Sequence, residues 1–293
     1  MAITASLVKE LRETTGAGMM DCKKALVETN GDAQAAAELL RKKGQASAAK
    51  KAGRIAAEGC IQIAASDDGK AIAILEVNCE TDFVAKDENF TRFAAVAADM
   101  ALAHKPASVE ALMELSGPDG VSLEETRATL IAKIGENIGV RRLYVIEAQG
   151  EIAAYVHSAR IGAVVDVVNG DAELGRDVAM HIAAAAPASI AEEDVDPELV
   201  AREKRILTEQ ALQEGKPAEI VEKMIAGRMR KFFAEVTLVG QPFVKDPDTT
   251  VGKLLASRGA RVVNFVRLEV GEGIEKKKED FAAEVEAQVR ASK

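Results

Sequence analysis

The sequence predicts an α+β protein that begins with three short helices and continues as two related α+β subdomains with antiparallel sheets. Three observations support this prediction. Apolar residues recur at helical spacing through residues 1–45. From Gly59 onward the apolar period changes to two, which is typical of strands. The order strand, strand, helix, strand then occurs twice along the chain.

The composition favours helices with aliphatic cores. The chain has 293 residues, enough for about two domains. Hydrophobic residues make up 48% of the sequence but aromatic residues only 3%, and tryptophan is absent. Alanine and aliphatic side chains therefore supply most of the apolar bulk, which suits close helix packing.

The charge argues against direct binding to nucleic acid. The formal net charge is -9 and the isoelectric point is about 5.1, so the chain and a phosphate backbone repel each other. Proteins that read single-stranded RNA also need stacking aromatic side chains, which are scarce here. We therefore expect no nucleic-acid partner.

The cysteines and the N-terminal segment indicate a cytoplasmic protein. Cys22, Cys60 and Cys79 lack the paired spacing of a zinc site or a disulfide framework, so we expect buried thiols in a reducing compartment. No apolar run reaches the length of about 18 residues that a membrane span needs. Residues 1–16 have the pattern of a charged amphipathic helix instead of a signal sequence, so we expect no membrane contact.

Residues 1–55 are predicted to form a three-helix domain and a linker. Thr4 can cap the first helix, Asp32 can cap the third, and Gly44 is expected to end it. Residues 45–55 carry alanines and basic side chains, and they are predicted to be a linker or a connecting helix.

The core is predicted to consist of residues 56–140 as the first subdomain and residues 141–190 with 237–273 as the second. The first contains a hairpin turn at Asp67-Asp68-Gly69 and a strand at 71–77. Ser122 with Glu125 predicts a capping box at the start of a later helix. Residues 140–148 are predicted to be a strand that closes this unit. The second subdomain is predicted to contain strands at 151–157, 162–168 and 261–270 and a helix at 174–186.

A helical-hairpin arm, residues 191–236, is predicted to be inserted into the second subdomain. Asp196-Pro197 marks its start, and Gly215-Lys216-Pro217 separates its two helices. Its apolar face, which includes Met224, can pack within the hairpin, on the core or on a second copy, so a homodimer through the arm stays open. Residues 274–293 are predicted to form a C-terminal amphipathic helix.

Motifs for catalysis or cofactor binding are absent from the sequence. The Gly-Lys pairs that begin at residues 69, 215 and 252 lack the earlier glycine and the following Ser or Thr of a phosphate-binding loop. His104, His157 and His181 are far apart, and no serine has a nucleophile-elbow pattern. We expect no catalytic residue, no cofactor and no metal.

The segment at residues 80–86, ETDFVAK, differs from what its position predicts. It lies between a strand and a helix, where turn residues and polar groups are expected, yet it carries Phe83 and Val84. The matching stretch of the second subdomain, residues 169–172, has no phenylalanine. Either Phe83 caps the core under its own helix, or it is an exposed aromatic beside Asp82 and a hot spot for protein binding.

Met19 and Met20 raise the same question. Two adjacent methionines cannot both face one small core, so at least one is expected to be exposed or at an edge. The pair either fills a loose core or forms an adaptable interface.

Six segments of the chain resemble the elongation factor Ts family, and together they cover essentially its whole length. Ser158 is a departure, because family members often have glycine after the histidine. The matching segments are LR at 11–12, TGAGMMDCKKAL at 15–26, EVNCETDFVAK at 76–86, HSARIG at 157–162, QPFV at 241–244 and GEGIEK at 271–276.

The resemblance implies a fold and a function. It implies a ubiquitin-associated-like (UBA-like) three-helix domain, two related core subdomains, a coiled-coil dimerisation arm and a C-terminal module. It also implies a guanine-nucleotide exchange factor in translation elongation. Such a factor binds elongation factor Tu with GDP, disturbs its magnesium and phosphate site, and promotes exchange of GDP for GTP.

The resemblance further implies roles for individual residues. The loop of Thr81, Asp82, Phe83 and Val84 would enter the GTPase domain near its magnesium site, with Phe83 as a wedge between helices. The other partner-binding residues that it implies are Arg12, Met19 and Met20 toward the GTPase domain and His157 toward another domain of the partner.

Two other classes of function remain as alternatives. A scaffold or ribosome-bound adaptor would bind mainly through the three-helix domain, with a merely structural core. An enzyme would rest only on the loop carboxylate Asp82, which has no nearby base or metal motif in the sequence.

Overall fold

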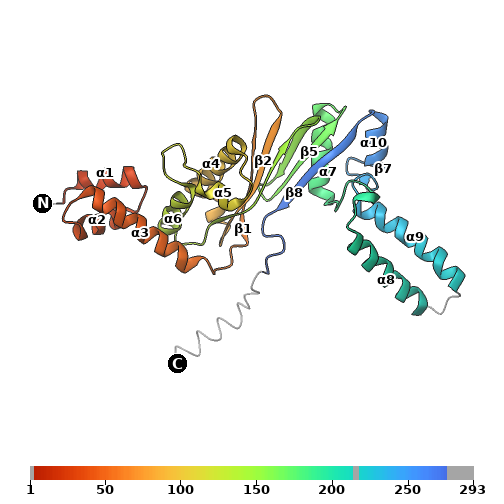
Figure 1. Cartoon of the computed structure of the whole chain (residues 1–293), viewed down its shortest axis with the longest axis horizontal. Coiled ribbons are helices and arrows are strands. Elements are labelled where there is room, and N and C mark those ends of the chain that lie inside the picture. Colours follow the sequence, from red (N-terminus) through yellow and green to blue (C-terminus); the bar gives the residue numbers. More distant parts are fainter. Residues whose placement is uncertain (1–2, 214–217, 276–293) are drawn as a thin grey trace.

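The computed structural model describes residues 3–213 and 218–275 and has the predicted α+β class. Figure 1 shows an elongated molecule with a three-helix bundle at one end, two sheets in the middle and a helical hairpin at the other end. The break predicted at Gly215-Lys216-Pro217 lies outside the described residues, as does all but the start of the helix predicted at 274–293.

The N-terminal bundle consists of α1 (Ala5–Thr15), α2 (Met19–Glu28) and α3 (Ala33–Lys51). The predicted cap of α1 is present, because Thr4 Oγ1 accepts a hydrogen bond from Leu7 N at 3.2 Å. Small and aliphatic side chains fill the bundle, as the composition predicts. Its buried residues are Val8, Leu11, Cys22, Ala25, Leu26 and Ala36.

The prediction that Gly44 ends the third helix is wrong, because α3 continues to Lys51. Gly44 is buried where α3 packs against α6 (Leu123–Ile134), and a Cβ at this position would lie 3.4 Å from the carbonyl oxygen of Ala128. A Cβ here would be in ordinary van der Waals contact with α6, and the packing of α3 on α6 outweighs the low helix propensity of glycine. One continuous helix therefore joins the bundle to the core.

The first sheet has three antiparallel strands in the order β1-β2-β3. Buried aliphatic and aromatic side chains join this sheet to its helices in one core, with Phe90 fully buried among them. The elements of this unit are β1 (Glu58–Ala65), β2 (Ala71–Cys79), β3 (Gly139–Glu147), α4 (Glu88–His104), α5 (Val109–Glu114) and α6.

A boundary drawn at residue 140 cuts through β3. This strand pairs with β2 from Ala71 opposite Glu147 to Asn78 opposite Gly139, so its hydrogen bonds belong to the first sheet. All of β3 therefore belongs to the first sheet, and the division of the chain into subdomains stays a prediction.

The second sheet has the order β4-β5-β8 and is also antiparallel. Its core includes residues of α7 and α10. In the turn between β4 and β5, Ser158 and Ala159 have φ angles of 50° and 57°, a region that favours glycine. Within the described residues, β6 and β7 pair with each other as a separate two-stranded sheet. The elements of this unit are β4 (Glu151–His157), β5 (Ile161–Val168), α7 (Ala172–Ala185), β6 (Pro242–Phe243), β7 (Asp246–Thr250), α10 (Val251–Ser257) and β8 (Arg261–Glu269).

The inserted arm is a hairpin of α8 (Pro197–Gln213) and α9 (Ala218–Val236), which extends away from the sheets (Figure 1). Ala211, Val221 and Met229 are buried, so part of the apolar face packs within the hairpin. Leu212 remains 59% exposed. A homodimer through the arm stays a prediction.

The two sheets pack against each other through a shared aliphatic cluster. One backbone hydrogen bond adds to this contact: Ile61 N donates to Ala159 O at 2.8 Å. The turn between β4 and β5 is thereby fixed to the first sheet. The buried members of the cluster are Ile61, Ile72, Ile74, Ile146, Val164, Leu268 and Val270.

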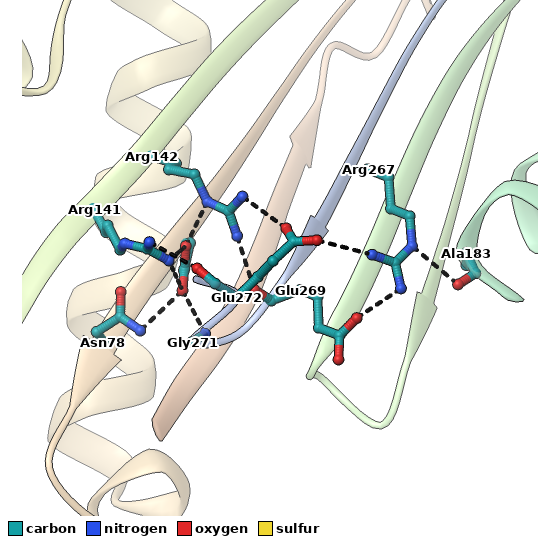
Figure 2. Close-up of polar contacts among 9 residues, drawn as sticks. Asn78, Arg141, Arg142, Ala183, Arg267, Glu269, Gly271 and Glu272 are labelled. Atoms are coloured by element: carbon teal, nitrogen blue, oxygen red, sulfur yellow. Dashed lines mark hydrogen bonds and ion pairs between the residues drawn. The ribbon is translucent and has the colours of Figure 1, made fainter. Parts of the chain in front are cut away.

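A fully buried carboxylate, Glu76 on β2, lies where the two sheets meet. Its oxygens accept hydrogen bonds from Gly271 N at 2.8 Å and from Asn78 Nδ2 at 2.9 Å. Arg142 Nε donates at 2.6 Å and Arg141 Nη1 at 3.2 Å. Figure 2 shows these four partners converging from β2, β3 and the segment after β8.

The network extends from Arg142 to the second sheet and its helix (Figure 2). Arg142 donates to the carbonyl of Glu269 at 2.8 Å and pairs with Glu272 at 3.0 Å. Arg267 pairs with Glu269 at 2.7 Å and donates to the carbonyl of Ala183 at 3.2 Å. The network thus connects both sheets with the end of α7.

The balance of burial and hydrogen bonding keeps Glu76 charged. Burial alone would raise the pKa of this carboxyl group. The hydrogen bonds from Gly271, Asn78 and Arg142 outweigh burial and lower the pKa below its ordinary value of 4.5. Because the folded state holds the charged form, this interaction stabilises the fold above about pH 4.5 and is lost as pH falls through the lowered pKa.

We expect Glu76→Gln to lower the free energy of unfolding by about 2–4 kcal/mol at pH 7, because two arginines lose a buried charged acceptor. Urea denaturation at several pH values measures this. The difference between the two proteins should shrink below about pH 4 as the native carboxyl group becomes protonated. Glu272→Gln is the control, since its half-exposed carboxylate should contribute less than about 1 kcal/mol. Equal stability of Glu76→Gln and the native chain at pH 7 would contradict the stabilising role of the charged Glu76 carboxylate.

Candidate partner-binding site

The loop after β2 lies between two well-defined ends. The strand ends at the buried Cys79, and a short 3₁₀ turn, Val84–Lys86, leads to α4. Asp87 caps α4, because its side chain accepts hydrogen bonds from Asn89 N at 2.8 Å and Phe90 N at 3.3 Å. The hydrogen bonds from the Asn89 side chain and these amides lower the pKa of Asp87, so the cap is charged.

Phe83 is 81% exposed at the tip of this loop. The alternative in which it caps the core is therefore wrong. Phe90 and Phe93 fill the core beneath α4, and Val84 packs against the same core from the loop. The loop thus has one apolar side chain that faces inward and one that faces solvent.

The carboxylate of Glu136, just after α6, holds the start of the loop. Its Oε2 accepts hydrogen bonds from the backbone N–H groups of Glu80 and Thr81, both at 3.0 Å, and its Oε1 accepts one from Thr81 Oγ1 at 2.6 Å. Thr81 Oγ1 in turn accepts from Val84 N at 3.3 Å, and Cys79 Sγ donates to Thr81 O at 3.1 Å. The backbone beside Phe83 is therefore fixed by polar contacts.

Asp82 is exposed and pairs with Lys86 at 3.1 Å. Both side chains are more than half exposed to solvent, so this pair adds little to stability. Asp82 is therefore available for contact with another molecule.

Met19 and Met20 are 59% and 61% exposed at the start of α2, so the alternative in which they fill a loose core is wrong. Val27 on the same helix is 56% exposed. Arg12 is exposed on the neighbouring helix α1. The bundle thus presents apolar and basic side chains to solvent.

His157 ends β4 and is exposed. Its Nδ1 lies 3.2 Å from the hydroxyl of Tyr155, and the two rings stack with centroids 6.2 Å apart. The residues predicted to bind a partner therefore lie on three parts of the fold: the loop after β2, the first two helices and the end of β4.

His181, Cys60 and Cys79 fit structural roles. His181 is buried, lies 3.0 Å from Gln241 Oε1, and accepts a hydrogen bond from Val244 N, and burial lowers its pKa. Burial raises the pKa of Cys60 to about 11 and that of Cys79 to about 12, so both thiols stay protonated. Across residues 3–213 and 218–275, no group of His, Cys, Asp and Glu has a geometry that could hold a metal ion.

The sequence interpretation did not identify Glu136, because its contacts with Glu80 and Thr81 span more than fifty residues of chain. The one local signal is Gly135, whose φ of 93° ends α6 and turns the chain just before the carboxylate. Separately, every helix in the described part of the chain is too short or too polar to cross a membrane.

Comparison with known proteins supports the family that the sequence motifs, including that of the loop, resemble. The family model described as elongation factor TS matches residues 80–272. Elongation factor Ts of Thioalkalivibrio sulfidiphilus is 60% identical over 294 residues, and that of Methylococcus capsulatus is 60% identical over 293, with both chains covered in full. Elongation factor Ts of Idiomarina loihiensis is 57% identical over 292 residues, which is all of this chain and 99% of the relative.

These matches place the chain among the translation elongation factors, which act in protein biosynthesis. More narrowly, it belongs to the elongation factor Ts family. Members of this family are in general nucleotide exchange factors for elongation factor Tu, rather than catalysts in the usual sense.

The exposure of Phe83 predicts that Phe83→Ala changes the free energy of unfolding by less than about 0.5 kcal/mol. Phe90→Ala, at a fully buried position in the first turn of α4, should lower it by about 3–5 kcal/mol. Thermal and urea unfolding of the two variants measure the contrast. A large loss of stability in Phe83→Ala would mean that its ring packs on the core in solution.

Proposed function

We propose that this chain is a guanine-nucleotide exchange factor that binds elongation factor Tu with GDP and promotes release of GDP and its exchange for GTP. The observation that carries the proposal is the exposed ring of Phe83 on a loop whose backbone is fixed. An exposed aromatic on a rigid support is typical of a protein-binding hot spot, since little conformational entropy is lost on binding. The family membership supplies the partner.

The proposed mechanism is displacement of groups that hold magnesium in the partner. Magnesium bridges phosphate oxygens and side chains of the GTPase, so moving those elements weakens nucleotide binding without a covalent step. Phe83 would act as the wedge, with Thr81, Asp82 and Val84 placing it. The factor then needs no catalytic group of its own.

Binding thermodynamics set a requirement on the interface. If the bound factor weakens GDP affinity, bound GDP weakens the affinity for the factor equally, so the complex without nucleotide is the tightest. A shift of about 10⁴ in the equilibrium needs roughly 5.5 kcal/mol, whereas burial of one phenylalanine supplies about 1.5–3 kcal/mol. Further contacts must contribute the difference.

The exposed residues of the bundle and of β4 are the proposed source of these contacts. In this proposal the bundle is UBA-like and touches the GTPase domain through Arg12, Met19 and Met20. His157 would meet another domain of the partner. The hairpin would act as a coiled-coil arm for a homodimer, and the chain would work in the cytoplasm, where translation takes place, without direct contact to nucleic acid.

The direct test is stopped-flow release of fluorescent GDP from elongation factor Tu with increasing amounts of the chain. We expect the native chain to accelerate release and Phe83→Ala to slow the accelerated rate by roughly 10- to 100-fold, the equivalent of one buried ring. Tyr144→Ala, which removes another exposed aromatic, 46% exposed on β3, should leave the rate unchanged.

No acceleration by the native chain would contradict the exchange function. The adaptor alternative predicts another result: a variant with both Met19→Gln and Met20→Gln would lose all binding to the partner, while Phe83→Ala would bind the partner as tightly as the native chain does. Both methionines are exposed, so this variant should fold as the native chain does.

A further inference from the structure

The end of β2 leaves two backbone amides without strand partners. Pairing with β1 ends at Cys79 opposite Glu58, and pairing with β3 ends at Asn78 opposite Gly139. The next two N–H groups, of Glu80 and Thr81, both donate to the same oxygen of Glu136. A single carboxylate therefore replaces the ladder at the point where the chain leaves the sheet, two residues before Phe83.

The contact is reciprocal. While Glu136 accepts from the backbone of Glu80, the side chain of Glu80 accepts from Asn137 N at 2.6 Å and pairs with Arg54 at 3.4 Å. Asn137 Nδ2 donates to Arg54 O at 2.9 Å. The segment after α6 is thus fastened both to the loop and to the chain that follows α3.

These observations make Glu136 more than a satisfied surface carboxylate. Phe83 is exposed, so no packing holds its ring, and its position depends on the backbone on either side. Thr81 connects the two sides, since it donates to Glu136 and accepts from Val84 N. We propose that Glu136 is a positioning residue that holds the loop in the shape in which Phe83 inserts into the partner, an inference that rests on the proposed exchange function.

The physical effect is preorganisation. Ordering a loop residue costs about 1–2 kcal/mol, and a loop that is fixed before binding avoids this cost when the wedge inserts. This saving in free energy applies when Phe83 inserts into the partner and not when the two proteins first meet. Loss of Glu136 should therefore lower the maximal rate of GDP release and have little effect on the concentration of factor at half-maximal rate.

Helix α6, which ends just before Glu136, also supports the N-terminal bundle. Lys51 Nζ, at the end of α3, donates to Ile131 O of α6 at 3.4 Å, and Arg41 pairs with Glu125 at 2.9 Å. Two of the three proposed contact regions, the bundle and the loop, therefore rest on α6 and the residues that follow it. Glu136 fixes the loop relative to this common support.

The test is Glu136→Gln, which keeps the shape of the side chain and removes its charge, in the native chain and in Phe83→Ala. In the native background we expect the maximal release rate at saturating factor to fall about 3- to 10-fold, the equivalent of one ordinary hydrogen bond. In the Phe83→Ala background the further change should be less than about 2-fold, because Glu136 acts through Phe83. Glu124→Gln, which changes a carboxylate on α6 that pairs with Arg127, should change neither rate.

Hydrogen–deuterium exchange of the loop peptide provides a second measurement on the free factor. Glu136→Gln should speed exchange in the peptide that contains Glu80 and Thr81 about 10-fold or more, with the peptides of β1 and β3 unchanged. Faster exchange across the whole first sheet, or unchanged exchange in the loop, would show a different role and overturn the inference.

The kinetic outcomes separate the inference from the proposed function. Normal release by Glu136→Gln, or an equal loss in both backgrounds, would overturn the positioning role while the wedge stands. If Phe83→Ala itself released GDP at the native rate, the wedge and the positioning role would both fail.

Discussion

The relative position of the two sheets depends on the burial of one carboxylate, Glu76. A buried charge is costly unless it is fully hydrogen bonded, and here two arginines, an amide side chain and the backbone of Gly271 supply the donors. Gly271 has a φ of 76°, and a Cβ there would lie 2.3 Å from the carbonyl oxygen of Ala57, so only glycine fits this contact. The aliphatic cluster between the sheets supplies the apolar burial, and the polar network fixes its geometry.

In the proposed exchange function, this fixed core would support the surfaces that contact the partner. The loop after β2, the N-terminal bundle and the end of β4 present exposed side chains, and each is fastened to the core. Glu136 fastens the loop, α3 fastens the bundle through its contact with α6, and Ala159 fastens the β4–β5 turn through Ile61. In the proposed function, surfaces held in this way would lose little conformational entropy on binding a partner.

Features with local patterns could be predicted from the sequence, and features that depend on tertiary contacts could not. The caps at Thr4 and Ser122 and the order of strands follow from spacing and turn chemistry, and the structure confirms them. The continuation of α3 through Gly44 depends on the closeness of α6, which outweighs local propensity. The position of Phe83 is unusual in the sequence, but its exposure is evident only from the tertiary structure, in which Phe90 is buried and Phe83 is not. Glu136 contacts the loop from a distant point of the chain, and its one local signal is the glycine that ends α6 just before it.

The most direct test of the central claim, that the loop enters the magnesium site of the partner, is photocrosslinking with benzoylphenylalanine in place of Phe83. The complex with elongation factor Tu would be illuminated without nucleotide and with excess GDP, and the crosslinked peptides would be identified by mass spectrometry. The account predicts crosslinks to the segments that hold magnesium and phosphate, and their loss with excess GDP. Crosslinks only to another domain of the partner, or none at position 83 while the same probe at position 20 reacts, would contradict it.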